Sequence, residues 1–233
     1  MSGPLRGMVI AVDGPAGAGK STVSRCLARA LGYRYVETGA MYRIIGVLAA
    51  EQRLDLSDGA ALAGLCDATH IEFVERDGRV RACANGRDLS EAIRTPEAAQ
   101  LASKVSAVPA VRQRLVAKQR AMGTGGEVVM EGRDIGTVVF PEAPLKVFLD
   151  ASVQERARRR ARELGGSSGM LDLARTMEEI AERDARDRGR AHSPLRPATD
   201  AVVIDTTSTP IDEVVRTLLA LVEKRAAALA SQG

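Results

Sequence analysis

The stretch GPAGAGKST, residues 14–22, most constrains what this chain can fold into. A short β-branched run at residues 8–12 precedes it, and apolar residues recur at helical spacing from Lys20 to Leu31. The stretch matches the pattern G-x-x-x-x-G-K-[ST], which binds phosphate when a strand precedes it and a helix follows it. Glycines let backbone N–H groups turn inward around phosphate oxygens. The sequence therefore predicts a phosphate-binding loop between a buried strand and a helix.

The chemistry of such a loop gives its residues separate tasks. Lys20 adds a positive charge to the β and γ phosphates of a nucleoside triphosphate, and the Ser21 hydroxyl can hold Mg²⁺. The predicted ATP-binding residues of the loop are Gly14, Pro15, Ala16, Gly17, Ala18, Gly19, Lys20, Ser21 and Thr22, with Ser21 as the metal ligand. The loop alone leaves motors, GTPases and small-molecule kinases open. The single asparagine, Asn85, is followed by glycine, which excludes the N-K-x-D guanine-reading motif of GTPases.

Length and composition suit a single domain of ordinary size. With 233 residues, 45% of them hydrophobic, the chain can form one globular domain or one domain with an insertion. No apolar stretch approaches the roughly 20 residues of a membrane helix. Residues 1–7 lack the charged-then-apolar plan of a signal peptide. We therefore expect a cytoplasmic protein without a membrane partner.

The cysteines and histidines indicate neither a disulfide framework nor a metal site. Cys26, Cys66 and Cys83 have no C-x-x-C spacing, and we expect them to be small buried side chains. His70 and His192 lie far apart, which disfavours a histidine-based nucleophile. A net charge of +3 and an aromatic content of 3% argue against a duplex-binding surface or a stacking platform for nucleic acid.

Strands and helices alternate along much of the chain. Further strand-like runs lie at residues 33–37, 127–131, 145–150 and 201–205, and helical patterns begin near Val153 and Ile211. This alternation predicts a parallel sheet covered on both faces by helices. Residues 70–86 instead alternate polar and apolar around Asp77-Gly78, which predicts a β-hairpin. The predicted fold is α/β, with a parallel five-stranded sheet and an inserted subdomain, from about Ser57 to about Ser106, that carries a small antiparallel sheet.

Two charged stretches are expected at the carboxyl ends of strands, where an open α/β sheet binds ligands. In ETGAMYR, residues 37–43, Thr38 is a good N-cap, and Tyr42 and Arg43 would project toward the same crevice. Taken alone, this stretch favours ordinary capping and packing. In EGRD, the charged side chains of Arg133 and Asp134 follow an apolar run beyond a glycine, which favours a ligand role for both.

Arginines are concentrated near residues 154–166 and 181–194. In the second stretch Arg183, Asp187 and Arg190 fall at i, i+4 and i+7, one face of a helix, which alone fits a solvated salt-bridge ladder. The first stretch holds Arg156, Arg158, Arg159, Arg160 and Arg162 beside the glycine-serine loop at 163–171. Planar, permanently charged donors of this kind suit phosphoryl transfer, with a flap that closes over the phosphates. Contact with RNA is the alternative. Glu155 and Glu163 would offset part of the positive charge of such an RNA-binding surface.

These stretches together resemble the bacterial cytidylate kinase family of nucleoside monophosphate kinases. The resemblance runs through DGPAGAGKST, TGAMYR, IRTPE, VPAVRQRL, EGRDIGTVVFPEAPLKVFLDAS, RDARDRGRAHSPL and DAVVIDTT, which cover nearly the whole chain. The phosphate loop is generic, whereas the other stretches are specific to the family. The sequence departs from the family pattern at Glu37 and Glu131, where aspartate is expected, and at Ala185, where another aspartate can occur.

The resemblance implies ATP-dependent phosphorylation of CMP and dCMP with Mg²⁺. It implies that Ser103, Arg112 and Asp134 read the cytosine and that Arg183 and Asp187 hold the ribose. It also implies that Arg43, Arg133 and Arg190 clamp the acceptor phosphate, with Tyr42 and Thr38 nearby. Arg158 would bind ATP, and Arg160 would act from the lid. The catalytic residues implied are Lys20, Arg133, Arg190 and Arg160.

The family organisation implies one kinase domain over residues 1–233. Its core would comprise residues 1–37, 107–155 and 190–233, its NMP-binding region with the insert about 38–106, and its lid about 156–175. We expect a monomer whose partners are ATP and CMP or dCMP, without nucleic acid. Two alternatives stay open, namely a kinase for UMP or a hydroxylated metabolite and an RNA-binding protein that uses ATP as a switch.

Overall fold

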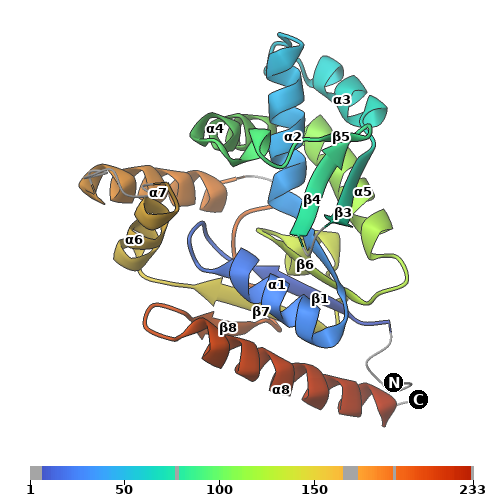
Figure 1. Cartoon of the computed structure of the whole chain (residues 1–233), viewed down its shortest axis with the longest axis vertical. Coiled ribbons are helices and arrows are strands. Elements are labelled where there is room, and N and C mark those ends of the chain that lie inside the picture. The colour runs from blue at the N-terminus through green and yellow to red at the C-terminus, as the bar shows by residue number, and fades with distance from the viewer. Residues whose placement is uncertain (1–6, 77–78, 165–172, 191–192, 232–233) are drawn as a thin grey trace. The chain divides into compact units, whose positions relative to one another are not determined.

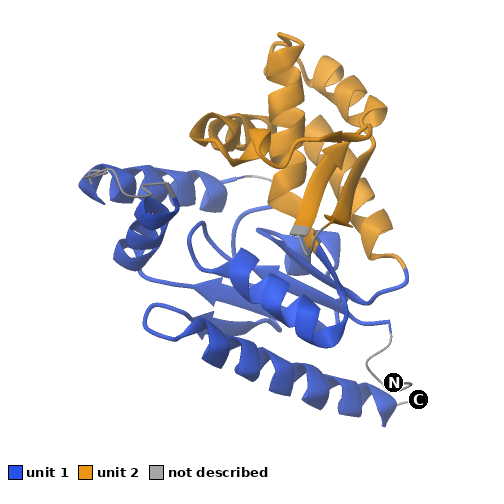
Figure 2. Cartoon of the chain, in the orientation of Figure 1, with its two compact units in different colours: residues 1–35, 125–233 blue, residues 36–124 orange. Residues whose placement is uncertain are grey.

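The computed structural model describes residues 7–76, 79–164, 173–190 and 193–231. The chain divides into two compact units, which Figure 2 shows in different colours. The first unit comprises residues 1–35 and 125–233, and the second comprises residues 36–124. The second unit is thus a continuous segment inserted between two parts of the first.

A five-stranded sheet forms the centre of the fold (Figure 1). Its strands are β1 (Val9–Asp13), β2 (Arg34–Glu37), β6 (Val128–Gly132), β7 (Leu145–Asp150) and β8 (Val202–Asp205), in the order β2-β6-β1-β7-β8. The pairs β1–β6, β1–β7 and β7–β8 are parallel. Every residue of β6 is buried, as expected for a parallel strand covered on both faces. The predicted α/β fold with a five-stranded parallel sheet is confirmed.

Helices of the first unit follow the strands as the alternation predicts. They are α1 (Lys20–Leu31), the single-turn π-helix η2 (Ile135–Val139), α6 (Val153–Leu164), α7 (Leu173–Arg188) and α8 (Ile211–Ala230). One apolar cluster joins α1 and α8 to the sheet, with Leu27 of α1 and Leu218 of α8 fully buried beside Ile10 of β1. This packing holds the start of α1, and therefore the phosphate loop before it, against the end of β1.

The second unit has its own apolar cluster, built around Ile44, Ile45, Leu62 and Leu115. Its elements are α2 (Thr38–Glu51), α3 (Gly59–Ala68), β3 (Ile71–Arg76), β4 (Arg79–Ala84), β5 (Arg87–Asp88), the 3-10 helix η1 (Ala92–Arg94), α4 (Pro96–Val105) and α5 (Pro109–Gly123). Strands β3, β4 and β5 form an antiparallel sheet, which confirms the predicted small sheet. The turn predicted at Asp77-Gly78 lies outside the described residues.

Three local features differ from the sequence-based expectations. Helix α2 begins at Thr38 itself and its N-cap is Glu37, because β2 runs into the helix without a loop; the predicted N-cap was wrong by one residue. Cys26 is exposed, whereas Cys66 and Cys83 are buried as predicted. Helix α5 packs on α2 and α3 in the second unit, whereas residues 107–124 were expected to belong to the core.

Arg34 joins the two points at which the chain leaves and re-enters the first unit. Its backbone N–H donates to the carbonyl of Glu127 at 2.8 Å, and its guanidinium donates to the carbonyl of Gly126 at 3.3 Å. A Cβ on Gly126 would overlap the backbone of Gly7, so a glycine is required at this crossing. Within the described residues, no helix is both long and apolar enough to cross a membrane.

Gly46 lets α2 and α4 pack closely and gives a test of the second unit. A Cβ at Gly46 would lie 2.8 Å from the Leu101 Cβ and 3.1 Å from the Leu101 carbonyl carbon. We expect Gly46→Ala to lower the free energy of unfolding by about 1–3 kcal/mol, because backbone atoms cannot move aside cheaply. Gly64 lies in α3, and a Cβ added there would have nothing within 4 Å, so Gly64→Ala should stabilise by up to about 1 kcal/mol.

Urea unfolding of both variants measures this difference. Equal changes of the same sign in the two variants would contradict the close packing of α2 on α4.

Candidate active site

The phosphate loop joins β1 to α1 in a conformation that requires glycine. Gly14 has φ +147°, and a Cβ there would overlap the carbonyl of Leu149 in the neighbouring strand β7. Gly17 has φ +77°, and its Cβ would come within 3.0 Å of Arg156. Gly14 and Gly17 are therefore needed both for the backbone angles and for close approach to β7 and α6.

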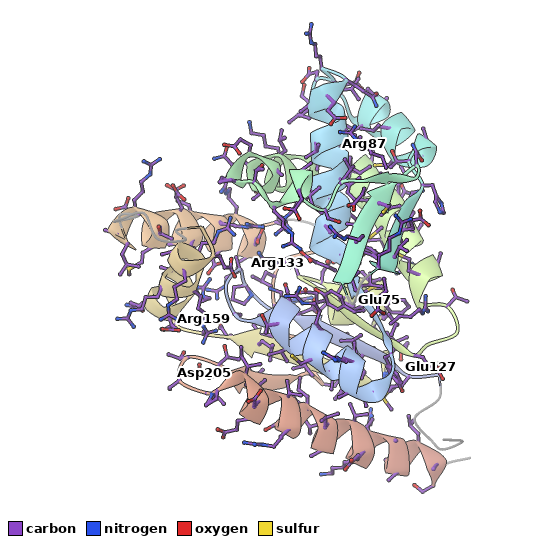
Figure 3. The ribbon with its side chains drawn as sticks, viewed as in Figure 1. Glu75, Arg87, Glu127, Arg133, Arg159 and Asp205 are labelled. Carbon is purple, nitrogen blue, oxygen red and sulfur yellow. The ribbon has the colours of Figure 1, made fainter. Side chains whose placement is uncertain are left out.

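Four successive carbonyl groups of this loop accept hydrogen bonds. Lys20 Nζ donates to Pro15 at 2.8 Å, Arg156 Nη1 to Ala16 at 3.2 Å, Arg159 Nη1 to Gly17 at 3.3 Å and Thr206 Oγ1 to Ala18 at 3.0 Å. Arg159 is labelled in Figure 3. In a planar trans peptide the C=O and the following N–H point in opposite directions. Side chains that hold the carbonyls of Ala16 to Ala18 thus turn the following N–H groups toward the other side of the loop.

Lys20 is buried among charged groups. The pKa of its ammonium group is lowered to about 7, mainly by burial and also by the charges of Arg133 and Arg183, while Glu131 and Asp13 oppose the change. The cation is therefore poorly stabilised by the protein alone. A polyanionic ligand at the loop would favour the charged form and raise this pKa again.

Three guanidinium groups gather at one buried carboxylate, that of Asp187. Asp187 Oδ1 accepts from Arg190 Nη2 at 2.5 Å, and Asp187 Oδ2 lies 3.3 Å from Arg133 Nη1 and 4.0 Å from Arg183 Nε. The side chain of Asp187 is only 2% exposed, so this cluster is not the solvated ladder that the isolated helix would have formed. The structure brings together four of the predicted substrate residues, from the end of β6 (Arg133, labelled in Figure 3) and from α7 and the chain just after it.

Positive groups are concentrated in this cluster. Arg133, Arg183 and Arg190 lie together, and the acidic groups that act on Arg133 are Asp187, Asp184 and Glu131. Burial lowers the pKa of Arg133, and Arg190 lowers it too, whereas Asp187 and Asp184 oppose the change. A dianionic phosphate bound between such guanidinium groups would receive charge-assisted, bidentate hydrogen bonds.

Buried carboxyl groups surround the end of β6. Glu131 is 3% exposed and accepts a hydrogen bond from the Tyr35 hydroxyl of the neighbouring strand β2. Asp134 is 5% exposed, and its backbone carbonyl accepts from Val138 and Val139 in η2. The extra methylene of Glu131 therefore leaves its carboxylate within the buried site, held by a tyrosine.

The second unit contains the remaining predicted substrate residues. The Arg112 guanidinium lies 5.7 Å from the centroid of the Tyr42 ring, a cation–π distance, and Arg112 Nη1 donates to the Ser106 carbonyl at 3.4 Å. Arg43 pairs with Glu37 at 2.9 Å. Thr38 is buried and Ser103 is partly exposed. This unit thus brings Tyr42 and Arg112 together, while the grouping of Ser103 and Arg112 with Asp134 stays a prediction.

The two lid arginines carried over from the family face glutamates on their own helix. Arg158 Nη1 lies 3.7 Å from Glu155 and its side chain is 58% exposed, and Arg160 Nη1 donates to Glu163 at 3.2 Å. The arginines of α6 that contact the phosphate loop are instead Arg156 and Arg159. Most of the predicted glycine-serine loop, residues 165–171, lies outside the described residues, and the roles of Arg158 and Arg160 stay predictions.

Sequence reasoning missed several residues of this site, namely Asp13, Tyr35, Arg156, Arg159 and Thr206. Asp13 closes β1 directly before the first glycine of the loop, and that position is the signal that could have found it. Arg156 and Arg159 were visible only as members of an arginine-rich run. Their distinction from Arg158 depends on which face of α6 packs against the protein.

Arg156 is the strongest test of how the loop is held. Its guanidinium donates to Ala151, to Ala16 and, at 2.6 Å, to Asp184 Oδ2, and both side chains of the ion pair are buried. We expect Arg156→Met to lower the free energy of unfolding by about 3–5 kcal/mol, because Asp184 is left as a buried unpaired charge. Chemical denaturation measures this loss.

A matched control is Arg175→Met, which removes an exposed ion pair with Glu179 in the same helix as Asp184. It should change stability by less than about 1 kcal/mol. Adding Asp184→Asn to Arg156→Met should recover part of the loss, since the buried charge is then gone. Equal effects of Arg156→Met and Arg175→Met would contradict the structural role of the buried pair.

Asp13 gives a pH dependence with a definite sign. The pKa of its carboxyl group is raised from 3.8 to about 7, mainly by burial and also by the charge of Asp134, while the N–H groups of Gly136 and Ile135 and the charge of Lys20 oppose the change. The folded chain therefore binds this proton more tightly than the unfolded chain, and stability falls as pH rises from about 4 to about 7. Above about 7 this contribution is constant.

Asp13→Asn removes the titrating group, so its free energy of unfolding should fall less steeply than that of the wild type between pH 5 and pH 7. Urea denaturation at four pH values measures both slopes. Parallel profiles would show that Asp13 does not titrate in this window.

The comparisons with known proteins concern the family and the fold of the chain. The profile of the cytidylate kinase family, described as "Cytidylate kinase", matches residues 10–224. A cytidylate kinase of Syntrophotalea carbinolica is 50% identical over 220 residues, which are 94% of this chain and 94% of that protein. A cytidylate kinase of Pelotomaculum thermopropionicum is 49% identical over 214 residues, 91% of this chain and 95% of that protein.

A solved structure supports the fold independently. A gluconokinase from Sinorhizobium meliloti 1021 superposes with a TM-score of 0.50 at 18% identity and covers 97% of both chains. At that identity the likeness concerns the fold alone. The match to the family profile over most of the chain, with relatives near half identity over more than nine tenths of it, shows that this chain belongs to the cytidylate kinase family.

Proposed function

We propose that this chain transfers the γ-phosphoryl group of ATP to CMP or dCMP and releases ADP with CDP or dCDP. The observation that carries the proposal is the cluster of three guanidinium groups at Asp187, in the same unit as a phosphate loop whose carbonyls are held by side chains. The phosphate loop suits the phosphates of the donor, and the cluster of guanidinium groups suits the phosphate of the acceptor. Membership of the cytidylate kinase family supports the identity of the acceptor.

The proposed reaction needs no protein base. A phosphate monoester has a second pKa near ~6, so its oxygen is already an anion at neutral pH. That oxygen attacks the γ-phosphorus, and the bond to the bridging oxygen of the departing ADP breaks. Catalysis then rests on positioning and on charge stabilisation, for which Lys20, Arg133 and Arg190 are the proposed groups.

The residues present fit a Mg²⁺ ion bound together with ATP. Mg²⁺ takes oxygen ligands and keeps several waters. Ser21 stands in the first turn of α1 and offers a hydroxyl of this type, and the buried carboxyl group of Glu131 acts on the neighbouring Lys20. When bound, the ion would neutralise part of the triphosphate charge, and Ser21 is its proposed protein ligand.

For the acceptor we propose the residues that the family pattern assigns. Ser103, Arg112 and Asp134 would read the base, Arg183 and Asp187 the ribose, and Arg43, Arg133 and Arg190 the phosphate, with Tyr42 and Thr38 nearby. Cytosine presents an amine where uracil presents a carbonyl, so a carboxylate that faces this position rejects uracil. The buried position of Asp134 and the stacking of Arg112 on Tyr42 support these assignments.

The remaining parts of the proposal concern organisation. We propose a monomeric, cytoplasmic enzyme in which residues 38–106 bind the monophosphate and residues 156–175 act as the lid, with ATP contacts from Arg158 and Arg160. Sedimentation of the purified chain tests the monomer. Attack of water on the reacting phosphate must be prevented in such an enzyme, since bound ATP would otherwise hydrolyse.

The first experiment measures ADP release from MgATP with CMP, dCMP, UMP, AMP or GMP supplied one at a time. Stimulation by CMP and dCMP, with weak UMP and silent purines, is the expected result. Stimulation by UMP alone would make the chain a kinase of another acceptor. Salt-dependent RNA binding without any turnover stimulated by a monophosphate would favour the nucleic-acid alternative.

Replacing Arg133 tests the phosphate clamp directly. We expect Arg133→Ala to lower kcat with CMP by about 10²-fold or more, because the transition state loses a guanidinium group, while MgATP still binds. Arg87→Ala is the matched control, since Arg87 forms an exposed pair with Glu51 in the second unit and should leave kcat unchanged. Steady-state kinetics with CMP compare the two variants, and near-normal turnover of Arg133→Ala would contradict the phosphate clamp.

A further inference from the structure

The carboxylate of Asp13 spans the space between the phosphate loop and the chain that follows β6. Asp13 is 4% exposed and is the last residue of β1, directly before Gly14. Its Oδ1 accepts the backbone N–H of Ile135 at 2.8 Å, and its Oδ2 accepts the backbone N–H of Gly136 at 2.7 Å. Both carboxylate oxygens are thus engaged by neighbouring N–H groups that lie 122 and 123 residues away in the sequence.

These two N–H groups belong to the start of η2, immediately after Arg133 and Asp134. Strand β6 ends at Gly132, whose register partner in β1 is Asp13 itself. Arg133 and Asp134 therefore occupy the two positions between the last paired residue of the strand and the N–H groups that Asp13 accepts. Fixing both ends of so short a segment determines where its two side chains point.

Close packing reinforces this arrangement from the other side. A Cβ on Gly136 would lie 3.4 Å from Asp13 Oδ2 and 3.2 Å from the Lys146 Cγ and Cδ atoms. Because residue 136 is a glycine, its N–H fits between Asp13 and Lys146 and can approach the Asp13 carboxylate. The backbone of η2 is therefore held between β1 and β7 rather than being free to slide.

An amide in place of the carboxylate could not make the same contacts. Asparagine has one acceptor oxygen and one NH₂ group, so one of the two N–H groups would face another donor. In a buried site that N–H loses its hydrogen bond, and the segment moves to recover one. The charged groups that act on Asp13 are Lys20 and Asp134. The ammonium group of Lys20 has no acceptor to offer in place of the lost oxygen.

We propose that Asp13 is a positioning residue that holds Arg133 and Asp134 in register with the phosphate loop. It acts on the reaction through these two side chains and not by touching the substrate. The inference rests on the proposed function, in which Arg133 binds the acceptor phosphate. A consequence is that loss of Asp13 damages use of the acceptor far more than binding of MgATP.

The test compares Asp13→Asn with the wild type at pH 8, above the pKa of about 7 of the Asp13 carboxyl group, so that this group is a carboxylate. The expected result is a fall in kcat/KM for CMP of about tenfold or more, with the Kd for MgATP in the absence of CMP changed by less than about threefold. The control is Asp58→Asn, which makes the same substitution at an exposed carboxylate whose Oδ1 accepts two backbone N–H groups at the start of α3. Asp58→Asn should leave both quantities unchanged.

A double-mutant cycle separates positioning from general damage. In the Arg133→Ala background, Asp13→Asn should lower kcat/KM for CMP by much less than it does in the wild type, because the group through which it acts is already gone. Fully additive effects would overturn the proposal, as would a parallel loss of MgATP affinity and CMP turnover. Unchanged CMP kinetics in Asp13→Asn would also overturn it.

Gly136→Ala approaches the same contact without altering any charge, and it decides the question if Asp13→Asn does not fold. It should lower kcat/KM for CMP at unchanged MgATP affinity, and wild-type kinetics in this variant would overturn the proposal. Wild-type protein without any CMP-dependent ADP release would instead refute the proposed function itself, so the two failures are distinguishable.

Discussion

The rest of the site depends on the orientation of a few peptide groups in the phosphate loop. A loop that offers N–H groups to a ligand must direct its carbonyl groups away from that ligand and toward other hydrogen-bond donors, because each peptide unit carries both groups. Here the carbonyls from Pro15 to Ala18 each accept a hydrogen bond from a side chain. Those donors come from α1, α6 and the residue that follows β8, so elements distant in sequence are needed to set one short turn. Electrostatic preorganisation of this kind is fixed before any ligand arrives.

Charge is concentrated at the same end of the sheet and is poorly balanced by the protein alone. Burial works against the positive charges of Lys20 and Arg133, and both groups are close enough to disfavour one another. Asp187 relieves part of this repulsion by pairing with three guanidinium groups. An anionic ligand bound at this place would favour the charged forms of Lys20 and Arg133. The buried carboxylate of Asp187 therefore brings the three guanidinium groups together at one place.

Local sequence patterns predicted the central fold well because they were unambiguous. The helix predicted from Lys20 to Leu31 has those bounds in the structure, since glycines flank it on both sides, and the strand at 145–150 was also located to the residue. Helix α5 was less readable because its polar and apolar residues do not separate clearly onto two faces. Its place in the second unit is decided by packing against α2 and α3, which no local pattern encodes.

The site was predicted in its residue types but only partly in its contacts. The alternation of Arg183, Asp187 and Arg190 located one charged face, yet the burial of Asp187 and its approach to Arg133 depend on tertiary structure. Among the arginines of α6, the sequence could not distinguish Arg156 from Arg158. The partner of Arg156 lies 28 residues further on, and the burial of one face of the helix decides the matter. The partners of Asp13 are more distant still.

The hydrogen bonds of Arg34 to Gly126 and Glu127 close the chain around the whole second unit, across a separation of 92 residues for the guanidinium contact. Because these hydrogen bonds join its two ends, the second unit can change in length or sequence without disturbing the sheet or the phosphate loop of the first unit.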